Sequence, residues 1–106
     1  MTPTSPMVTL INIYQCQAPQ QDALVALLHE INGEVSRHRE GFVSAKVLVG
    51  KDGTSAAVIA QWQSEDHWRA LMRDIRINSL MEQVMKIATF APRLYQETKS
   101  FLPEVL

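Results

Sequence analysis

Apolar and polar residues follow one another along the chain in segments that predict alternating strands and helices. Residues 8–16 (VTLINIYQC) are rich in β-branched and aromatic side chains and have the length of a strand. Apolar residues from Leu24 to Val35 then recur at helical spacing. We therefore expect a strand over 8–16, and after it a helix that begins at Pro19 and stops before Gly41.

The middle of the chain predicts a β-hairpin. Strands are expected over residues 42–50 and 54–63, where β-branched and small apolar residues dominate. Between them lies Lys51-Asp52-Gly53, and an Asp-Gly pair readily adopts the positive φ of a tight turn.

The last third of the chain predicts a helical region in two parts, followed by a strand. Ser64 is suited to cap a helix that breaks near Asp74. Ser79 with Glu82 forms a capping-box pattern, so a further helix is expected to open there and to end at Pro92. We expect the last strand over 93–101, one domain over 8–101, a disordered tail over 1–7 and a short tail over 102–106.

The resulting order, β-α-β-β-α-β, predicts an α+β fold of the ferredoxin-like kind, with a four-stranded antiparallel sheet and helices on one face. The strands are apolar on both faces, although helices can cover only one. A second copy of the sheet is the simplest cover, so we expect a face-to-face homodimer. The opposed residues are Val8, Leu10 and Tyr14 against Ile11 and Ile13; Val43, Ala45, Val47 and Val49 against Phe42 and Leu48; and Ala56, Val58, Ala60 and Trp62 against Ala57 and Ile59.

Composition and charge exclude several classes of function. The 106 residues fit one domain, and ten basic against eleven acidic residues leave a net charge of −1. Nucleic-acid binding needs clustered Lys and Arg, so no nucleic-acid partner is expected. Neither a basic amphipathic helix nor a membrane-spanning run occurs, and residues 1–6 do not resemble a signal peptide. We expect no membrane partner and a cytoplasmic location.

The sequence carries no motif for a bound metal or cofactor. It contains no Gly-rich phosphate loop and no dinucleotide fingerprint. Cys16 is the only cysteine, and it is interpreted as a small apolar strand residue. His29, His38 and His67 are too scattered to suggest a ligand set. We therefore expect neither a metal nor a cofactor.

Three short segments resemble the antibiotic biosynthesis monooxygenase family. They are Gly41-Phe42-Val43-Ser44-Ala45, Asp52-Gly53-Thr54 and Ala60-Gln61-Trp62-Gln63-Ser64-Glu65. The resemblance implies a dimeric α/β-barrel with a pocket between sheet and helices in each subunit. The resemblance covers roughly residues 8–100, is densest from Gly41 to Arg69, and is greatest to the branch that oxidises polycyclic aromatic polyketides without a cofactor. In that branch a Trp at Trp62, an aromatic residue at Trp68 and an Arg near Arg76 line the pocket.

The sequence also departs from its apparent relatives. That branch tends to carry a pocket Asn where this chain has Val58. Haem-degrading relatives place an Asn at Asn12, but they need an axial histidine, and only His67 follows Trp62. Quinol-oxidising relatives often carry several histidines along this helix, of which only His67 is present. The resemblance therefore favours the cofactor-free branch over haem degradation.

Oxygenation without a cofactor is possible where the substrate itself supplies the electrons. A deprotonated phenol or anthrone can pass one electron to O2 and combine with the superoxide formed, if the pocket stabilises the anion. We predict that Trp62 and Arg76 orient and stabilise this anion and that Asn12 or His67 assists proton removal. Trp68, Tyr14 and Met72 are the predicted substrate-binding residues.

Each of these residues also has a structural interpretation. Trp62, Trp68, Tyr14 and Met72 are also suited to packing, whereas Arg76 and His67 suit a solvated surface, and Asn12 needs only a buried partner. The function predicted is a cofactor-independent monooxygenase for a polycyclic aromatic phenol, anthrone or quinol, with O2 and a small aromatic substrate as its partners. The alternatives are a non-catalytic protein that binds an aromatic ligand, and a haem-binding or haem-degrading relative.

Overall fold

The computed structural model describes residues 7–105, and its elements follow the predicted order. The expected N-terminal tail over residues 1–7 therefore lies, except for Met7, outside the described residues. Short 3-10 turns at Ala18–Gln20 and Ser36–His38 and a π-helical turn at Ile31–Val35 flank the first helix. The main elements are β1 Val8–Cys16, α1 Gln21–Glu30, β2 Phe42–Val49, β3 Ser55–Trp62, α2 Glu65–Met72, α3 Ile75–Met85 and β4 Ala88–Tyr95.

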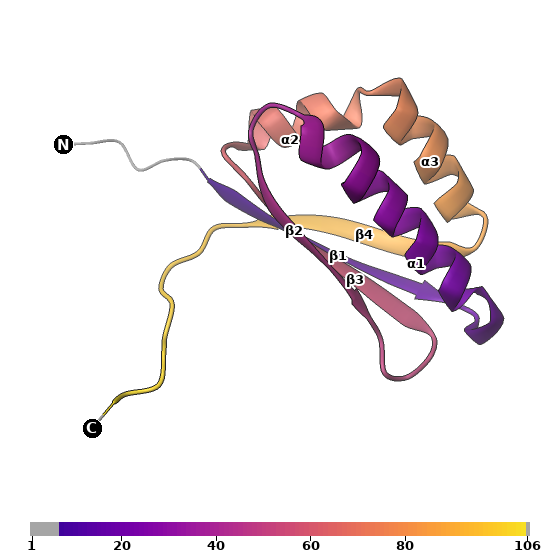
Figure 1. Cartoon of the computed structure of the whole chain (residues 1–106), viewed down its shortest axis with the longest axis horizontal. Coiled ribbons are helices and arrows are strands. Elements are labelled where there is room, and N and C mark those ends of the chain that lie inside the picture. Colours follow the sequence, from indigo (N-terminus) through magenta and orange to yellow (C-terminus); the bar gives the residue numbers. More distant parts are fainter. Residues whose placement is uncertain (1–6, 106) are drawn as a thin grey trace.

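The four strands form one antiparallel sheet in the order β2-β3-β1-β4. In Figure 1, the helices α1, α2 and α3 all lie on the same side of this sheet. Because β1 pairs with both β3 and β4, it lies inside the sheet, while β2 and β4 form its edges. The predicted ferredoxin-like α+β fold is confirmed.

The register of the sheet places one set of β1 and β3 side chains beneath the helices. Leu10 lies opposite Ala60, Asn12 opposite Val58 and Tyr14 opposite Ala56. These residues are buried, whereas the side chains between them point to the other face. The two-face alternation predicted for the first and third strands is confirmed, and we call the helix-covered side the inner face.

The alternation predicted for the second strand was wrong at its start. A β-bulge between Phe42 and Ser44 shifts the register. Phe42 pairs with Trp62 and Ser44 with Gln61, so Val43 is an extra residue on β2. Phe42 therefore packs against the core on the inner face together with Ala45 and Val47, instead of opposing them. Val43, predicted to share their face, is exposed.

The first helix changes its geometry before it ends. Leu24 and Leu28 of α1 are fully buried against the sheet, and each such side chain contributes about 1.5–3 kcal/mol to stability. Over Ile31–Val35 the helix becomes a π-helix, whose i→i+5 bonds make a wider turn. The buried stripe consequently shifts by one position, and the consecutive residues Val35 and Ser36 are both buried. The helical region ends at His38, and Gly41, with φ +86°, lies in the turn that leads into β2.

The start of the third helix differs from the prediction. Ser64 caps α2 as expected, since its hydroxyl accepts the backbone N–H of His67 at 3.2 Å. The cap of α3, however, is Asp74, whose carboxylate accepts the backbone N–H groups of Arg76 and Ile77. Ser79 thus lies inside α3, and the predicted capping box was wrong because an earlier cap starts the helix at Ile75.

The last strand also begins earlier than predicted. Helix α3 ends at Met85, and β4 runs over Ala88–Tyr95 instead of 93–101. Pro92 does not end a helix but lies within β4, which tolerates it because β4 is an edge strand with one side free of the ladder. This correction places Phe90 and Pro92 beside β1, opposite Tyr14 and Asn12.

Residues 96–105 contain no helix or strand and lead away from the sheet (Figure 1). Phe101 and Leu102 are 80% and 89% exposed. The domain boundary at residue 101 stays a prediction, since regular structure ends at Tyr95.

The outer face of the sheet, opposite the helices, carries exposed apolar side chains. Ile13 and Leu48 are 54% and 45% exposed, and both lie beside Ala57 in the ladder. A second row pairs Ile11 with Ile59, between Lys46 and Arg93 on the edge strands. In the part of the chain from residue 7 to 105, no helix is long and apolar enough to cross a membrane.

Candidate active site

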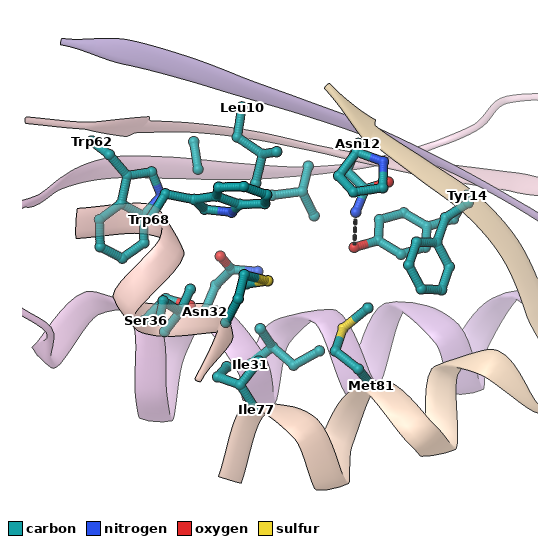
Figure 2. A pocket seen from close by; sticks show the side chains of 16 residues that line it. Leu10, Asn12, Tyr14, Ile31, Asn32, Ser36, Trp62, Trp68, Ile77 and Met81 are labelled. Carbon is teal, nitrogen blue, oxygen red and sulfur yellow. Dashed lines mark hydrogen bonds between the residues drawn. The ribbon is translucent and has the colours of Figure 1, made fainter. Parts of the chain in front are cut away.

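A cavity of about 80 Å³ lies between the inner face of the sheet and the helices. Figure 2 shows the sheet on one side of it and α1, with its π-helical turn, and α3 on the other. Most of its lining is apolar. From the sheet come Leu10, Val58, Ala60, Phe90 and Pro92, and from the helices come Ile31, Leu71, Met72, Ile77 and Met81.

Two neighbouring inner-face residues of β1, Asn12 and Tyr14, form a polar pair in the cavity. The Asn12 side-chain Nδ2 donates a hydrogen bond to the Tyr14 hydroxyl oxygen at 2.8 Å. Only 5% of Asn12 and 4% of Tyr14 is exposed, and Asn12 Oδ1 is buried without a hydrogen-bond partner among residues 7–105. Burial raises the pKa of the Tyr14 phenol well above its ordinary value, so this group stays neutral.

The two tryptophans lie toward the other end of the cavity (Figure 2). Trp62, at the end of β3, is almost fully buried and meets the ring of Phe42 edge to face, with centroids 5.4 Å apart. Trp68 reaches the cavity from α2. Both indole Nε1 atoms are buried without a hydrogen-bond partner in the described chain. The cavity is thus lined at one end by two tryptophans whose buried N–H groups have no partner in the described chain, and at the other by the Asn-Tyr pair.

The cavity is small for a polycyclic ligand. Pockets for drug-sized molecules usually measure about 300–1,000 Å³, and this one measures about 80 Å³. Lining side chains must therefore move when such a ligand binds. Met72 and Met81 suit this role because their unbranched side chains change rotamer easily, and Met72 already lies at the surface.

His67 lies outside the cavity lining. It occupies the first turn of α2, where its Nδ1 is 2.6 Å from the hydroxyl of Ser64 and its Nε2 is 3.8 Å from Glu40 Oε2. Its ring packs against Gly41, where an added Cβ would come within 2.2 Å of His67 Cγ. The structure thus places His67 against the loop that precedes β2.

Arg76 also lies outside the lining. It belongs to the first turn of α3 and not to the break between the helices. Its guanidinium Nη2 donates a long, exposed hydrogen bond of 3.5 Å to the backbone oxygen of Glu34. The structure therefore does not bring Arg76 together with Trp62.

Five of the seven predicted site residues line the same cavity: Asn12, Tyr14, Trp62, Trp68 and Met72. No Asp, Glu, Lys, Arg or His is among the described residues that line it. Between residues 7 and 105, no group of three or more His, Cys, Asp or Glu side chains is arranged to hold a metal ion.

Two polar lining residues, Asn32 and Ser36, were not found from the sequence. They belong to the π-helical turn and to the 3-10 turn after it. The Asn32 Nδ2 donates to the backbone oxygen of Leu28 at 2.8 Å, which leaves its Oδ1 as an acceptor at the helix side of the cavity. The available signal was Gly33, a helix-disfavouring residue within the predicted helix.

Comparisons with known proteins agree with this architecture. Tetracenomycin-F1 monooxygenase of Streptomyces glaucescens is 29% identical over 101 residues, which cover 95% of this chain and 90% of that protein. The structure of SnoaB, a cofactor-independent oxygenase from Streptomyces nogalater, has a TM-score of 0.75 at 20% identity and matches 93% of this chain and 99% of its own. A conserved protein from Methanosarcina mazei has a TM-score of 0.79 at 10% identity, over 89% of this chain and 95% of its own.

A sequence model of one family matches residues 7–73, a span that contains β1, α1, the β2-β3 hairpin and α2. This span supplies all five of the predicted residues that line the cavity. Because the match covers more than half of the chain, this protein belongs to the antibiotic biosynthesis monooxygenase family.

Proposed function

We propose that this chain is a cofactor-independent monooxygenase that oxidises a polycyclic aromatic phenol, anthrone or quinol with O2, in the biosynthesis of an aromatic polyketide. The observation that carries the proposal is the apolar cavity with Trp62, Trp68 and the Asn12–Tyr14 pair on its walls. The similarity to tetracenomycin-F1 monooxygenase supports the substrate class. The cytoplasmic location expected from the sequence is part of the same proposal.

The proposed reaction needs no external electron donor. An anthrone loses one ring CH proton to give an enolate, which passes one electron to O2. The radical and superoxide then form a C–O bond, and the resulting hydroperoxide loses water as its O–O bond breaks. The CH2 group becomes C=O, one oxygen atom enters the product and the other leaves as water. All four electrons that reduce O2 come from the substrate.

In this proposal the pocket acts by holding the anion in a dry, oriented site. Trp62 provides a ring surface and an indole N–H, and Trp68 forms a wall. Preorganised donors in an apolar site stabilise a developing anion more strongly than water does. Roles for Asn12 in proton removal, and for His67 and Arg76 in catalysis, stay predictions, and the positions of the last two outside the lining give them less support.

We also propose that two copies pack through their outer sheet faces. The support is the row formed by Leu48, Ala57, Ile13 and Ala91 across all four strands, with Ile11 and Ile59 beside it. These side chains are exposed or half-exposed although they are apolar. Burying such a patch against its symmetry copy stabilises a dimer.

Oxygen uptake tests the proposed activity. Under metal-free conditions, with anthrone or a hydroquinone as substrate, the protein should raise the rate of uptake well above the uncatalysed rate. Trp62→Phe, which keeps a buried aromatic ring but removes the N–H donor, should lower this rate. An uptake rate equal to the uncatalysed one, and unchanged by Trp62→Phe, would refute the proposal.

One observation favours a second candidate, a protein that binds an aromatic ligand without catalysis. The described lining contains no carboxylate, histidine or lysine that could accept the substrate's proton. Quenching of tryptophan fluorescence by an anthrone without oxygen uptake would favour this candidate. The haem alternative fits poorly, because His67 packs against Gly41 and does not line the cavity. Addition of haem should therefore produce no Soret shift.

A further inference from the structure

The hydroxyl group of Tyr14 is held in a defined arrangement inside the cavity. In Figure 2, it meets the side-chain nitrogen of Asn12 between the sheet and the helices. An amide nitrogen can only donate, so the Tyr14 oxygen is the acceptor of this bond. Within the described chain, this is the one side-chain hydrogen bond that the hydroxyl makes. Its own proton is therefore available to a ligand.

The Tyr14 hydroxyl also keeps that proton throughout the physiological range. The phenol is almost fully buried, and burial raises its pKa because a phenolate would lose its hydration. Tyr14 is thus a neutral hydrogen-bond donor and not a base. At the other end of the cavity, the Nε1 atoms of Trp62 and Trp68 are buried donors without a partner in the part of the chain that the structure describes.

The O–H and N–H donors of the cavity therefore match a ligand that accepts hydrogen bonds, while Asn12 Oδ1 and Asn32 Oδ1 are acceptors in the same lining. Buried polar groups are almost always hydrogen-bonded, so a ligand with acceptor oxygens would pair with these donors. Arg76 does not line the cavity, so stabilisation of a substrate anion falls to the neutral donors of the lining. Hydrogen bonds to the charged form of a group favour that form, and the effect is stronger where water is excluded.

From these observations, and building on the proposed function, we propose that Tyr14 is a catalytic residue that donates its hydroxyl hydrogen to the ionised oxygen of the substrate. Asn12 is a positioning residue, because its Nδ2 holds the Tyr14 oxygen and so directs the proton into the cavity. The ligand class is a flat aromatic oxyanion with acceptor oxygens at two edges. One oxygen meets Tyr14, and the other meets the indole N–H groups of Trp62 and Trp68.

A ligand that reports its own ionisation tests this role without turnover. The probe is 2-hydroxyanthraquinone, which is already oxidised and whose phenolate absorbs at a longer wavelength than the phenol. Its apparent pKa is measured by absorbance while it is bound to wild type, to Tyr14→Phe and to Tyr95→Phe. The last variant removes the same hydroxyl from a tyrosine on the outer face, 47% exposed and outside the cavity lining.

A hydrogen bond to a charged group is strong enough to change the ratio of ionised to neutral bound probe by about 10-fold to 100-fold. The pKa of the bound probe should therefore be about one to two units higher in Tyr14→Phe than in wild type. Tyr95→Phe should match wild type. Asn12→Leu, which leaves the hydroxyl in place but unheld, should give a smaller increase, as a positioning role requires.

Several outcomes would overturn the proposal. One is an equal pKa of the bound probe in wild type and Tyr14→Phe; another is a failure of wild type to bind the probe. If Tyr14→Phe does not fold, the Asn12→Leu variant decides, and an unchanged pKa there contradicts the proposal. Oxygen uptake with an equal pKa of the bound probe in wild type and Tyr14→Phe would contradict the role of Tyr14 and leave the proposed function supported. A pKa difference without oxygen uptake would support the role of Tyr14 in binding the anion and would contradict the proposed monooxygenase activity.

Discussion

The two faces of the sheet are made from similar apolar residues but differ in their surroundings. On the inner face, the apolar residues Leu10, Val58 and Ala60 line a cavity together with Asn12, whose Oδ1 has no partner among the described residues. On the outer face, Ile11 and Ile13 alternate with these positions along β1 and meet no helix. The inner face therefore presents polar groups to a cavity, whereas the outer face presents apolar side chains that none of the described helices covers. This difference supports the two proposals made above, ligand binding at the inner face and dimer formation through the outer face.

The largest effect should come from a charge on the outer face. Ile13→Asp would place a carboxylate in the proposed interface, where burial of an unpaired charge costs several kcal/mol. We expect wild type to sediment as a dimer of twice 12.0 kDa. The variant's dissociation constant should rise by about 100-fold or more. Gln15→Asp, at a polar position on the same face, should leave the dimer intact. A stable single-copy wild type at micromolar concentration would contradict the assignment.

The next largest effect is on the free energy of unfolding, when neighbouring residues of β1 that point to opposite faces are each shortened. Leu10→Ala removes a buried inner side chain, and should lower the free energy of unfolding by about 2–4 kcal/mol at every protein concentration. Ile11→Ala removes a similar volume from the outer face. Its cost should depend on concentration, because it acts on association. Urea unfolding over a range of protein concentrations separates the two, and equal, concentration-independent losses would remove the distinction.

A double variant should separate stability from binding on the inner face. Asn12→Leu with Tyr14→Phe replaces both members of the polar pair by apolar groups of similar size. Such paired replacements are neutral or stabilising, so the free energy of unfolding should stay unchanged or rise by about 1–2 kcal/mol. Binding of 2-hydroxyanthraquinone should weaken strongly. A large loss of stability would mean that the pair serves the fold instead of a ligand.

The smallest effect concerns pH. Because the pKa of Tyr14 is raised above its ordinary value of 10, the folded chain keeps a proton that the unfolded chain loses above that pH. This contribution to stability is complete below pH 10 and decreases above it, by up to about 1.4 kcal/mol per pH unit. Wild type should therefore lose more stability than Tyr14→Phe between about pH 9 and about pH 11 in urea unfolding. Tyr95→Phe should behave as wild type does.

Much of the inner face could be predicted from the sequence, because period-two alternation in β1 and β3 survives in the structure. It placed Asn12 and Tyr14 on one face of β1, since strand neighbours two residues apart share a face, whereas the family resemblance supplied Trp62. The prediction failed where backbone geometry changes the period. The bulge at Phe42 and the π-helical turn at Ile31–Val35 each shift the pattern by one residue, and neither has a firm sequence signature.

Boundary errors explain the remaining missed residues. Pro92 is typical of a helix end, and only the position of β4 at the sheet edge makes it acceptable in a strand. Because the strand was expected after it, Phe90 and Pro92 were not considered as part of a site. The placement of Arg76 depended on where α3 begins, and that was decided by Asp74 rather than by Ser79.

The π-helical turn has an evolutionary consequence. Its wide turn holds one residue more than an α-helical turn would, so deletion of a single residue there can return the segment to α-helix. That deletion would rotate everything after it by about 100° and change whether Asn32 and Ser36 or their apolar neighbours meet a ligand. Among homologous chains, gain or loss of one residue in this segment would therefore alter substrate preference while every wall on the sheet side stays the same.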